Sequence, residues 1–262
     1  MHIVAIHQLQ GNPEEQARKL ADALGNTPYE ARARVSIPGG GPAIVANFAT
    51  PERATACVEL LNAAGFKALV VDSDRIESDR NRMLVRQLQF ATNSLQLVTR
   101  DNTTHDIPLH EVKLLLRGTG ITSSVQVETE TKKKFALGRA VASGGLVMSK
   151  KVKTTSRNIS EERQPFCHVY VPGQPPVVLR QSEIDYSALG EQRQPSREAN
   201  FNWICAELRR RCAAADWDDR LQTRPGLAQL LGPAFDPETY LDLAITLVVL
   251  AQEHNAYSYR SS

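Results

Sequence analysis

The sequence predicts an α+β protein, with helices and strands alternating over residues 1–72 and short strands dominating from Met83 onward. Three observations carry this prediction. Strand-like runs, such as residues 67–72, are interleaved with capped amphipathic helices in the first part of the chain. From Met83 on, short runs rich in β-branched residues are separated by turn residues. Helical patterns with apolar faces then follow Ser196.

The N-terminal segment, residues 1–72, contains four predicted strands and two predicted helices. Asn12-Pro13-Glu14-Glu15 has the pattern of a helix start, with Glu15 placed to complete a capping box, and Thr50-Pro51 begins the second helix. The predicted strands lie at 2–9, 30–37, 43–48 and 67–72, and the helices end at Gly25 and Gly65. The resulting order, β-α-β-β-α-β, is that of the ferredoxin-like fold.

Three consecutive glycines, Gly39, Gly40 and Gly41, suggest either a phosphate-binding loop or a tight turn. A phosphate loop needs a helix directly after it, so that backbone N–H groups and the helix dipole face the anion. A predicted strand at 43–48 follows these glycines instead, and no Lys-Ser/Thr pair is present. We therefore expect the glycines to supply the positive φ of a hairpin turn.

The charged segment "DSDRIESDRNR", residues 72–82, predicts a solvent-exposed linker at 73–82. Its carboxylates lack the glycine and the terminal glutamate of a calcium loop, so exposed surface is preferred over a cation site. Beyond the linker we predict a β-rich unit at 83–213 and a C-terminal helical extension at 214–262.

The β-rich unit is a series of short strands closed by the helix that follows Ser196. This strand set resembles the pleckstrin-homology-like domains of bacteria, and the run "IPLHEVKLLLRG", residues 107–118, resembles one of their strands. The resemblance covers residues 83–213. It implies a barrel closed by C-terminal helices and a binding scaffold that works without catalysis.

The most strongly charged part of the sequence is an insertion at 131–163. It holds nine cationic residues against Glu161 and Glu162, a net charge of +7 in a chain with a net charge of +2. Such a segment is either an electropositive arm for a polyanion or an acidic protein surface, or a solvated loop. Phe135 is its one aromatic residue, which argues against base stacking. The candidate binding residues are Lys132, Lys133, Lys134, Arg139, Lys150, Lys151, Lys153 and Arg157.

No catalytic, cofactor or metal site is predicted. The stretch "HDIPLHE", residues 105–111, lacks both the H-E-x-x-H pattern and a paired helical spacing of histidines. Cys167 and His168 are adjacent on a predicted strand and point to opposite faces, so they cannot form a nucleophile–base pair. The four cysteines have no C-x-x-C spacing, which predicts buried, reduced thiols.

The longest apolar run, residues 241–251, is too short to span a bilayer and predicts a buried helix. Either the rest of the fold or another subunit must cover this helix, and the second alternative implies a homo-oligomer. No signal-peptide pattern is present at the start, so we expect a cytoplasmic location. The predicted function is that of a non-catalytic intracellular binding or adaptor protein. The alternatives are a nucleic-acid-associated protein that uses residues 131–163, and an enzyme whose site is assembled from residues distant in sequence.

Overall fold

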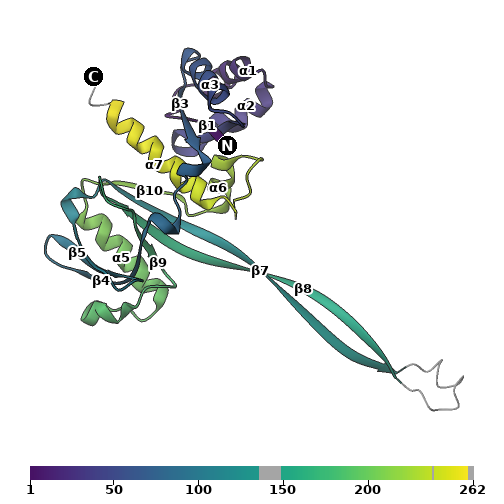
Figure 1. The fold of residues 1–262 in the computed structure, drawn as a ribbon, viewed down its shortest axis with the longest axis vertical. Helices are drawn as coiled ribbons and strands as arrows, with labels where there is room; N and C mark the ends of the chain where they lie inside the picture. Colours follow the sequence, from purple (N-terminus) through teal and green to yellow (C-terminus); the bar gives the residue numbers. More distant parts are fainter. Residues whose placement is uncertain (136–148, 238, 259–262) are drawn as a thin grey trace, which may run out of the picture. The chain divides into compact units, whose positions relative to one another are not determined.

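The computed structural model describes residues 1–135, 149–237 and 239–258. It is a mixed α+β structure with two sheets, as the sequence predicts (Figure 1). Residues 1–120 and 164–262 form one compact unit, and residues 121–163 form a second. The predicted boundaries near residues 72, 82 and 213 stay a prediction.

A three-stranded antiparallel sheet forms the N-terminal part of the first unit, in the order β2-β1-β3. Its first helix begins as predicted, because the side chain of Asn12 accepts a hydrogen bond from the backbone N–H of Glu14 at 2.8 Å. Glu15 completes no capping box and pairs with Lys19 instead, at 2.7 Å. The elements are β1 (His2–His7), α1 (Pro13–Leu24), α2 (Pro28–Val35), β2 (Ala43–Phe48), α3 (Pro51–Ala63) and β3 (Lys67–Asp72).

The strand predicted at 30–37 is wrong, because helix α2 occupies most of this segment. Thr27 and Glu30 form a reciprocal capping box that starts the helix, and Pro28 occupies its first turn. Ala31 and Val35, four residues apart, are buried on one face of the helix. The alternation of alanine and arginine fits a strand period as well as this helical spacing. The ferredoxin-like β-α-β-β-α-β order is therefore not formed, since a helix replaces its second strand.

The glycines at 39–41 do form a turn, with φ values of 74°, 73° and 95°. The turn joins helix α2 to strand β2, so the prediction of positive φ is confirmed and that of a hairpin between two strands is wrong. No helix follows the turn. The glycines lie against the chain that leaves β1, where the Leu9 N–H donates to the Gly40 carbonyl at 2.9 Å.

The second sheet has the strand order β10-β7-β8-β9-β4-β5-β6. The predicted short strands are confirmed as β4 (Met83–Phe90), β5 (Ser94–Thr99), β6 (Thr104–Pro108) and β9 (Val177–Arg180). Strands β7 (Leu114–Phe135) and β8 (Ser149–Tyr170) overlap two predicted short strands, but each has 22 residues and extends into the insertion predicted at 131–163. Strand β10 (Asp216–Leu221) was not predicted, and it pairs in parallel with β7. In the described part of the chain the sheet is open, with β10 and β6 at its edges, and no closed barrel is formed.

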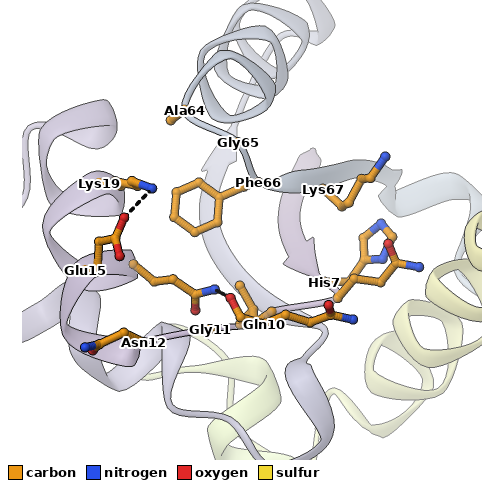
Figure 2. A pocket seen from close by; sticks show the side chains of 13 residues that line it. His7, Gln10, Gly11, Asn12, Glu15, Lys19, Ala64, Gly65, Phe66 and Lys67 are labelled. Carbon is orange, nitrogen blue, oxygen red and sulfur yellow. Dashed lines mark hydrogen bonds and ion pairs between the residues drawn. The ribbon is translucent and has the colours of Figure 1, made fainter.

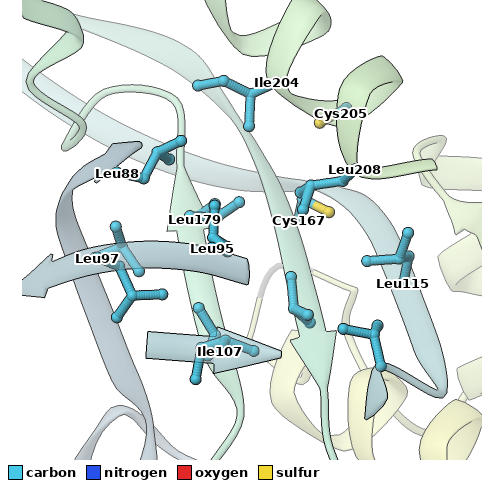
Figure 3. Close-up of a cluster of buried hydrophobic side chains, with 14 of the residues drawn as sticks. Leu88, Leu95, Leu97, Ile107, Leu115, Cys167, Leu179, Ile204, Cys205 and Leu208 are labelled. Carbon is cyan, nitrogen blue, oxygen red and sulfur yellow. The ribbon is translucent and has the colours of Figure 1, made fainter. Parts of the chain in front are cut away.

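Helix α5 (Arg197–Arg211) packs on this second sheet, and the residues between them form one hydrophobic core (Figure 3). The Ser196 hydroxyl caps the helix by accepting from the backbone N–H of Ala199 at 3.0 Å. Ile204 and Leu208 project from α5 toward the strands. The four cysteines are buried and free, as predicted, and three of them (Cys167, Cys205 and Cys212) belong to this core.

Both faces of the three-stranded sheet are covered. Helices α1, α2 and α3 pack on the face that carries Val4 and Ile6. The opposite face, which carries Ile3 and Val71, packs against helices α6 (Arg224–Leu231) and α7 (Leu241–Ser258). The predicted apolar helix is α7, and its central residue Leu247 is completely buried within the same chain. This burial needs no second subunit.

None of the helices in the described residues is both long enough and apolar enough to cross a membrane.

Candidate functional site

The predicted cationic residues lie on two paired strands. Lys132, Lys133 and Lys134 come just before the end of β7 at Phe135. Lys150, Lys151, Lys153 and Arg157 follow the start of β8 at Ser149. The two strands are hydrogen-bonded neighbours and run side by side (Figure 1), so the structure gathers both groups at adjoining strand ends. Arg139 lies outside the described residues.

We call the strand segments 121–135 and 149–163 the basic ribbon. It holds eight cationic residues and four glutamates, a net charge of +4, whereas the whole chain has a net charge of +2. The described strand segments therefore concentrate positively charged residues on two paired strands.

A second group of charged residues surrounds Arg82, whose side chain is only 1% exposed. Its Nη1 lies 2.7 Å from Asp242 Oδ1 and 3.3 Å from Asp79 Oδ1. Its Nε lies 3.4 Å from Glu77 Oε2. Asp79 is also bound by Arg180, at 2.6 Å. Asp74, Arg75, Arg80 and Asn81 are exposed, as expected, but the end of the segment 72–82 is anchored to β9 and α7.

Glu77 is held in this cluster by three kinds of contact. Besides its contact with Arg82, its carboxylate accepts a hydrogen bond from the Tyr170 hydroxyl at 3.1 Å, and its backbone N–H donates to Thr246 Oγ1 at 3.0 Å. Burial raises the pKa of the Glu77 carboxyl above its ordinary value, although the Arg82 charge and the Tyr170 hydrogen bond oppose this effect. Burial also raises the pKa of Tyr170.

His168 extends the cluster, since its Nδ1 lies 3.2 Å from the Tyr170 hydroxyl. Burial lowers the pKa of His168 well below its ordinary value, so the imidazole is neutral near pH 7. The carboxylates of this cluster contact arginines, and the His168 ring contacts the Tyr170 hydroxyl. The cluster therefore holds together segments that are far apart in the sequence. The i, i+2 spacing of His168 and Tyr170 on one strand face was the sequence signal for it.

A cavity of about 390 Å³ lies beside the end of β1 (Figure 2). Phe66 forms part of its wall, and Lys67 and the paired Lys19 and Glu15 contribute charges. The Gln16 amide donates to the Gln10 carbonyl across its rim. The cavity offers hydrogen-bonding and charged groups to a small polar molecule.

The residues weighed for catalysis are not brought together. His105 lies in β6, and His110 is exposed, with Nε2 3.8 Å from Glu111 Oε1. Cys167 and His168 point to opposite faces of β8, as predicted: Cys167 is in the core under α5, and His168 contacts Phe166 with ring centroids 4.9 Å apart. Within the described residues, no group of three or more histidine, cysteine, aspartate or glutamate side chains could hold a metal ion.

No family model matches the chain, and no curated protein or solved structure is significantly similar to it.

Proposed function

We propose that this protein is a non-catalytic binding protein that engages nucleic acid through the basic ribbon. The observation that carries the proposal is the concentration of positive charge, eight cationic residues against four glutamates, on two paired strands. Contacts between cations and phosphates supply most of the affinity in sequence-independent nucleic-acid binding. The adaptor role predicted from the sequence is compatible with this activity.

Two features favour a duplex over a single strand. The major groove of B-form DNA admits a two-stranded β-ribbon, and the basic ribbon has this form. Single-strand binding relies on aromatic side chains that stack on the bases. Phe135 is the one aromatic residue among residues 121–135 and 149–163.

The resemblance of residues 83–213 to pleckstrin-homology-like domains is kept here as a proposal about the shape of this part of the chain. A series of strands followed by helix α5 supports it at the level of element order. On this proposal the second sheet is a scaffold, and its strands β7 and β8 continue into the basic ribbon.

The test is binding of a fluorescent DNA duplex of about 30 base pairs, measured by anisotropy between about 50 and 200 mM KCl. The variant K132E/K133E/K134E changes the net charge of the ribbon from +4 to −2. We expect its affinity to fall at least about tenfold and its salt dependence to become shallower, because fewer counterions are released.

The matched control replaces three exposed arginines elsewhere, Arg18, Arg75 and Arg193, by glutamate. It changes the total charge equally and should bind the duplex much more tightly than the ribbon variant. Equal losses in both variants would show that total charge, not the ribbon, controls binding. Absence of duplex binding at about 50 mM KCl, or binding only to a polyglutamate probe, would refute the nucleic-acid proposal.

A further inference from the structure

A groove of about 710 Å³ lies along strand β2, at the opposite end of the sheet order from β3. Residues 44–47 of β2 line it, together with helix α2 and the segment 231–235. Helix α2 packs on one face of the three-stranded sheet, and the segment 231–235 belongs to the core on the other face. The groove therefore runs along the edge of the sheet, between the two layers that cover its faces.

Strand β2 is an edge strand with an unused hydrogen-bonding side. It pairs with β1 along one side only. In the described chain, no backbone group of residues 43–48 bonds to anything other than β1. An exposed edge of this kind is a template for a further strand, which would gain main-chain hydrogen bonds over about 20 Å.

Helix α2 lines one wall with Arg32, Arg34 and Glu30, and the Glu30 carboxylate is bonded to Thr27 in the capping box. Pro233 contributes exposed apolar surface to the other wall, where Phe235 is buried. Tyr29 on α2 also lines the groove and is 87% exposed. Exposed aromatic and arginine side chains are enriched in binding surfaces.

Arg34 is the residue that indicates the charge of the occupant. Its guanidinium donates to the Gln229 carbonyl at 3.1 Å and packs on Gly232, where an added Cβ would lie 2.4 Å from Nη1. Partial burial lowers the pKa of Arg34. Arg32 has a carboxylate partner, Glu14 at 3.3 Å, whereas Arg34 forms no ion pair within the described residues. Its remaining N–H donors suit a carboxylate that enters the groove.

We propose that this groove binds an extended segment of a partner protein, which adds to the sheet beside β2 and places an acidic side chain on Arg34. A second copy of the chain fits less well. Its β2, Ala43–Phe48, carries no acidic side chain that could be placed on Arg34. An acidic extended segment supplies one.

The probe is a pool of amidated peptides of about eight residues, with β-branched residues at alternate positions and one central glutamate. A matched pool has glutamine in place of the glutamate. We expect the glutamate pool to bind about tenfold more tightly. We also expect it to slow hydrogen exchange of backbone amides within Ala43–Phe48, which would place the peptide on the edge strand.

Arg34→Gln should abolish the preference for the glutamate pool, and Arg34→Lys should keep part of it. Arg18→Gln is the matched control, because Arg18 is exposed on α1 outside the groove. If Arg34→Gln loses only the contact with the carboxylate, the peptides should still slow exchange in β2 of this variant. That result would show that strand addition persists without the carboxylate contact. K132E/K133E/K134E should bind the peptides like the wild type, so the outcome is independent of the basic ribbon.

Three results would overturn the proposal. The first is that neither pool slows exchange in β2. The second is that Arg34→Gln binds the glutamate pool like the wild type. The third is that exchange in β2 slows with rising protein concentration while the mass in solution doubles, which would assign the groove to a second copy.

Discussion

The guanidinium of Arg82 lies 2.7 Å from the carboxylate of Asp242, although 160 residues separate them in the sequence. The pair joins the end of the segment 72–82 to the first turn of α7. Because Arg82 also contacts Glu77 and Asp79, one buried cation serves three carboxylates. The position of α7 therefore depends on the charge of Arg82, which lies in the segment predicted to be a linker.

Arg82→Met should therefore destabilise the protein strongly. Glu77 would be left partly buried without its cation, whereas Asp242 and Asp79 are 46% and 43% exposed and would be solvated, so we expect a cost of about 1–3 kcal/mol. The matched control is Lys19→Met, which breaks the exposed Lys19–Glu15 pair and should cost about 0.5 kcal/mol or less. Urea denaturation at neutral pH measures both, and equal effects would show that the Arg82 cluster contributes no more than a surface pair.

The raised pKa of Glu77 should affect how the stability of the protein changes with pH. Its pKa is raised in the folded protein, so the folded state retains the Glu77 proton better than the unfolded chain does. Stability contributed by this group therefore falls as the pH rises from about 4.5 through the folded pKa. In Glu77→Gln this loss is absent, so the stability of the variant relative to the wild type should rise with pH over that range. A relative stability that falls with pH would mean that Arg82 outweighs burial.

Substitution of Gly40 by alanine should cost more than substitution of Gly25. Both residues have positive φ, 73° and 67°, so both variants carry the strain of a left-handed backbone, about 1–2 kcal/mol. A Cβ at Gly40 would also lie 2.9 Å from the Leu9 carbonyl oxygen, whereas none of the described atoms lies within 4 Å of a Cβ at Gly25. The difference between the two melting temperatures isolates the close approach. If the two variants have the same melting temperature, the close approach of Gly40 to Leu9 does not contribute to the cost of the substitution.

Leu247→Asp should abolish cooperative unfolding, because it places a charge without a partner in a completely buried site. Leu60→Asp makes the same change at a leucine that is 57% exposed and should alter stability by about 0.5 kcal/mol or less. Circular dichroism during heating compares them. A cooperative transition of wild-type midpoint in Leu247→Asp would contradict the burial of α7 in this chain.

Local signals in the sequence were sufficient for most of the helices and strands. Asn12, Ser196 and Gly25 mark helix ends, and their capping geometry is observed. The error at α2 arose because alternating small and cationic residues satisfy two periods at once. The Thr27-Pro28-x-Glu30 pattern of a capping box was the signal that decides between them.

The features that escaped prediction depend on partners far away in the chain. Strand β10 is rich in aspartate, and it forms because β7 offers a parallel edge to it. Arg82 is buried because Asp242 and Glu77 surround it, and a run of charges gives no indication of such partners. The groove at β2 could not be predicted either, since it required helix α2 and the segment 231–235 to flank one strand.

The packing of α7 against the three-stranded sheet also has a consequence for biosynthesis. The face of the sheet that carries Ile3 and Val71 is complete once residue 72 has been made, but the helices that cover it, α6 and α7, begin only at Arg224 and Leu241. At translation rates of about 5–20 residues per second, this apolar face remains exposed for roughly ten to thirty seconds before the covering helices are synthesised. During that interval the nascent chain exposes an apolar surface of the kind that chaperones recognise, and a chain released before residue 241 would lack the part of the cover that α7 provides.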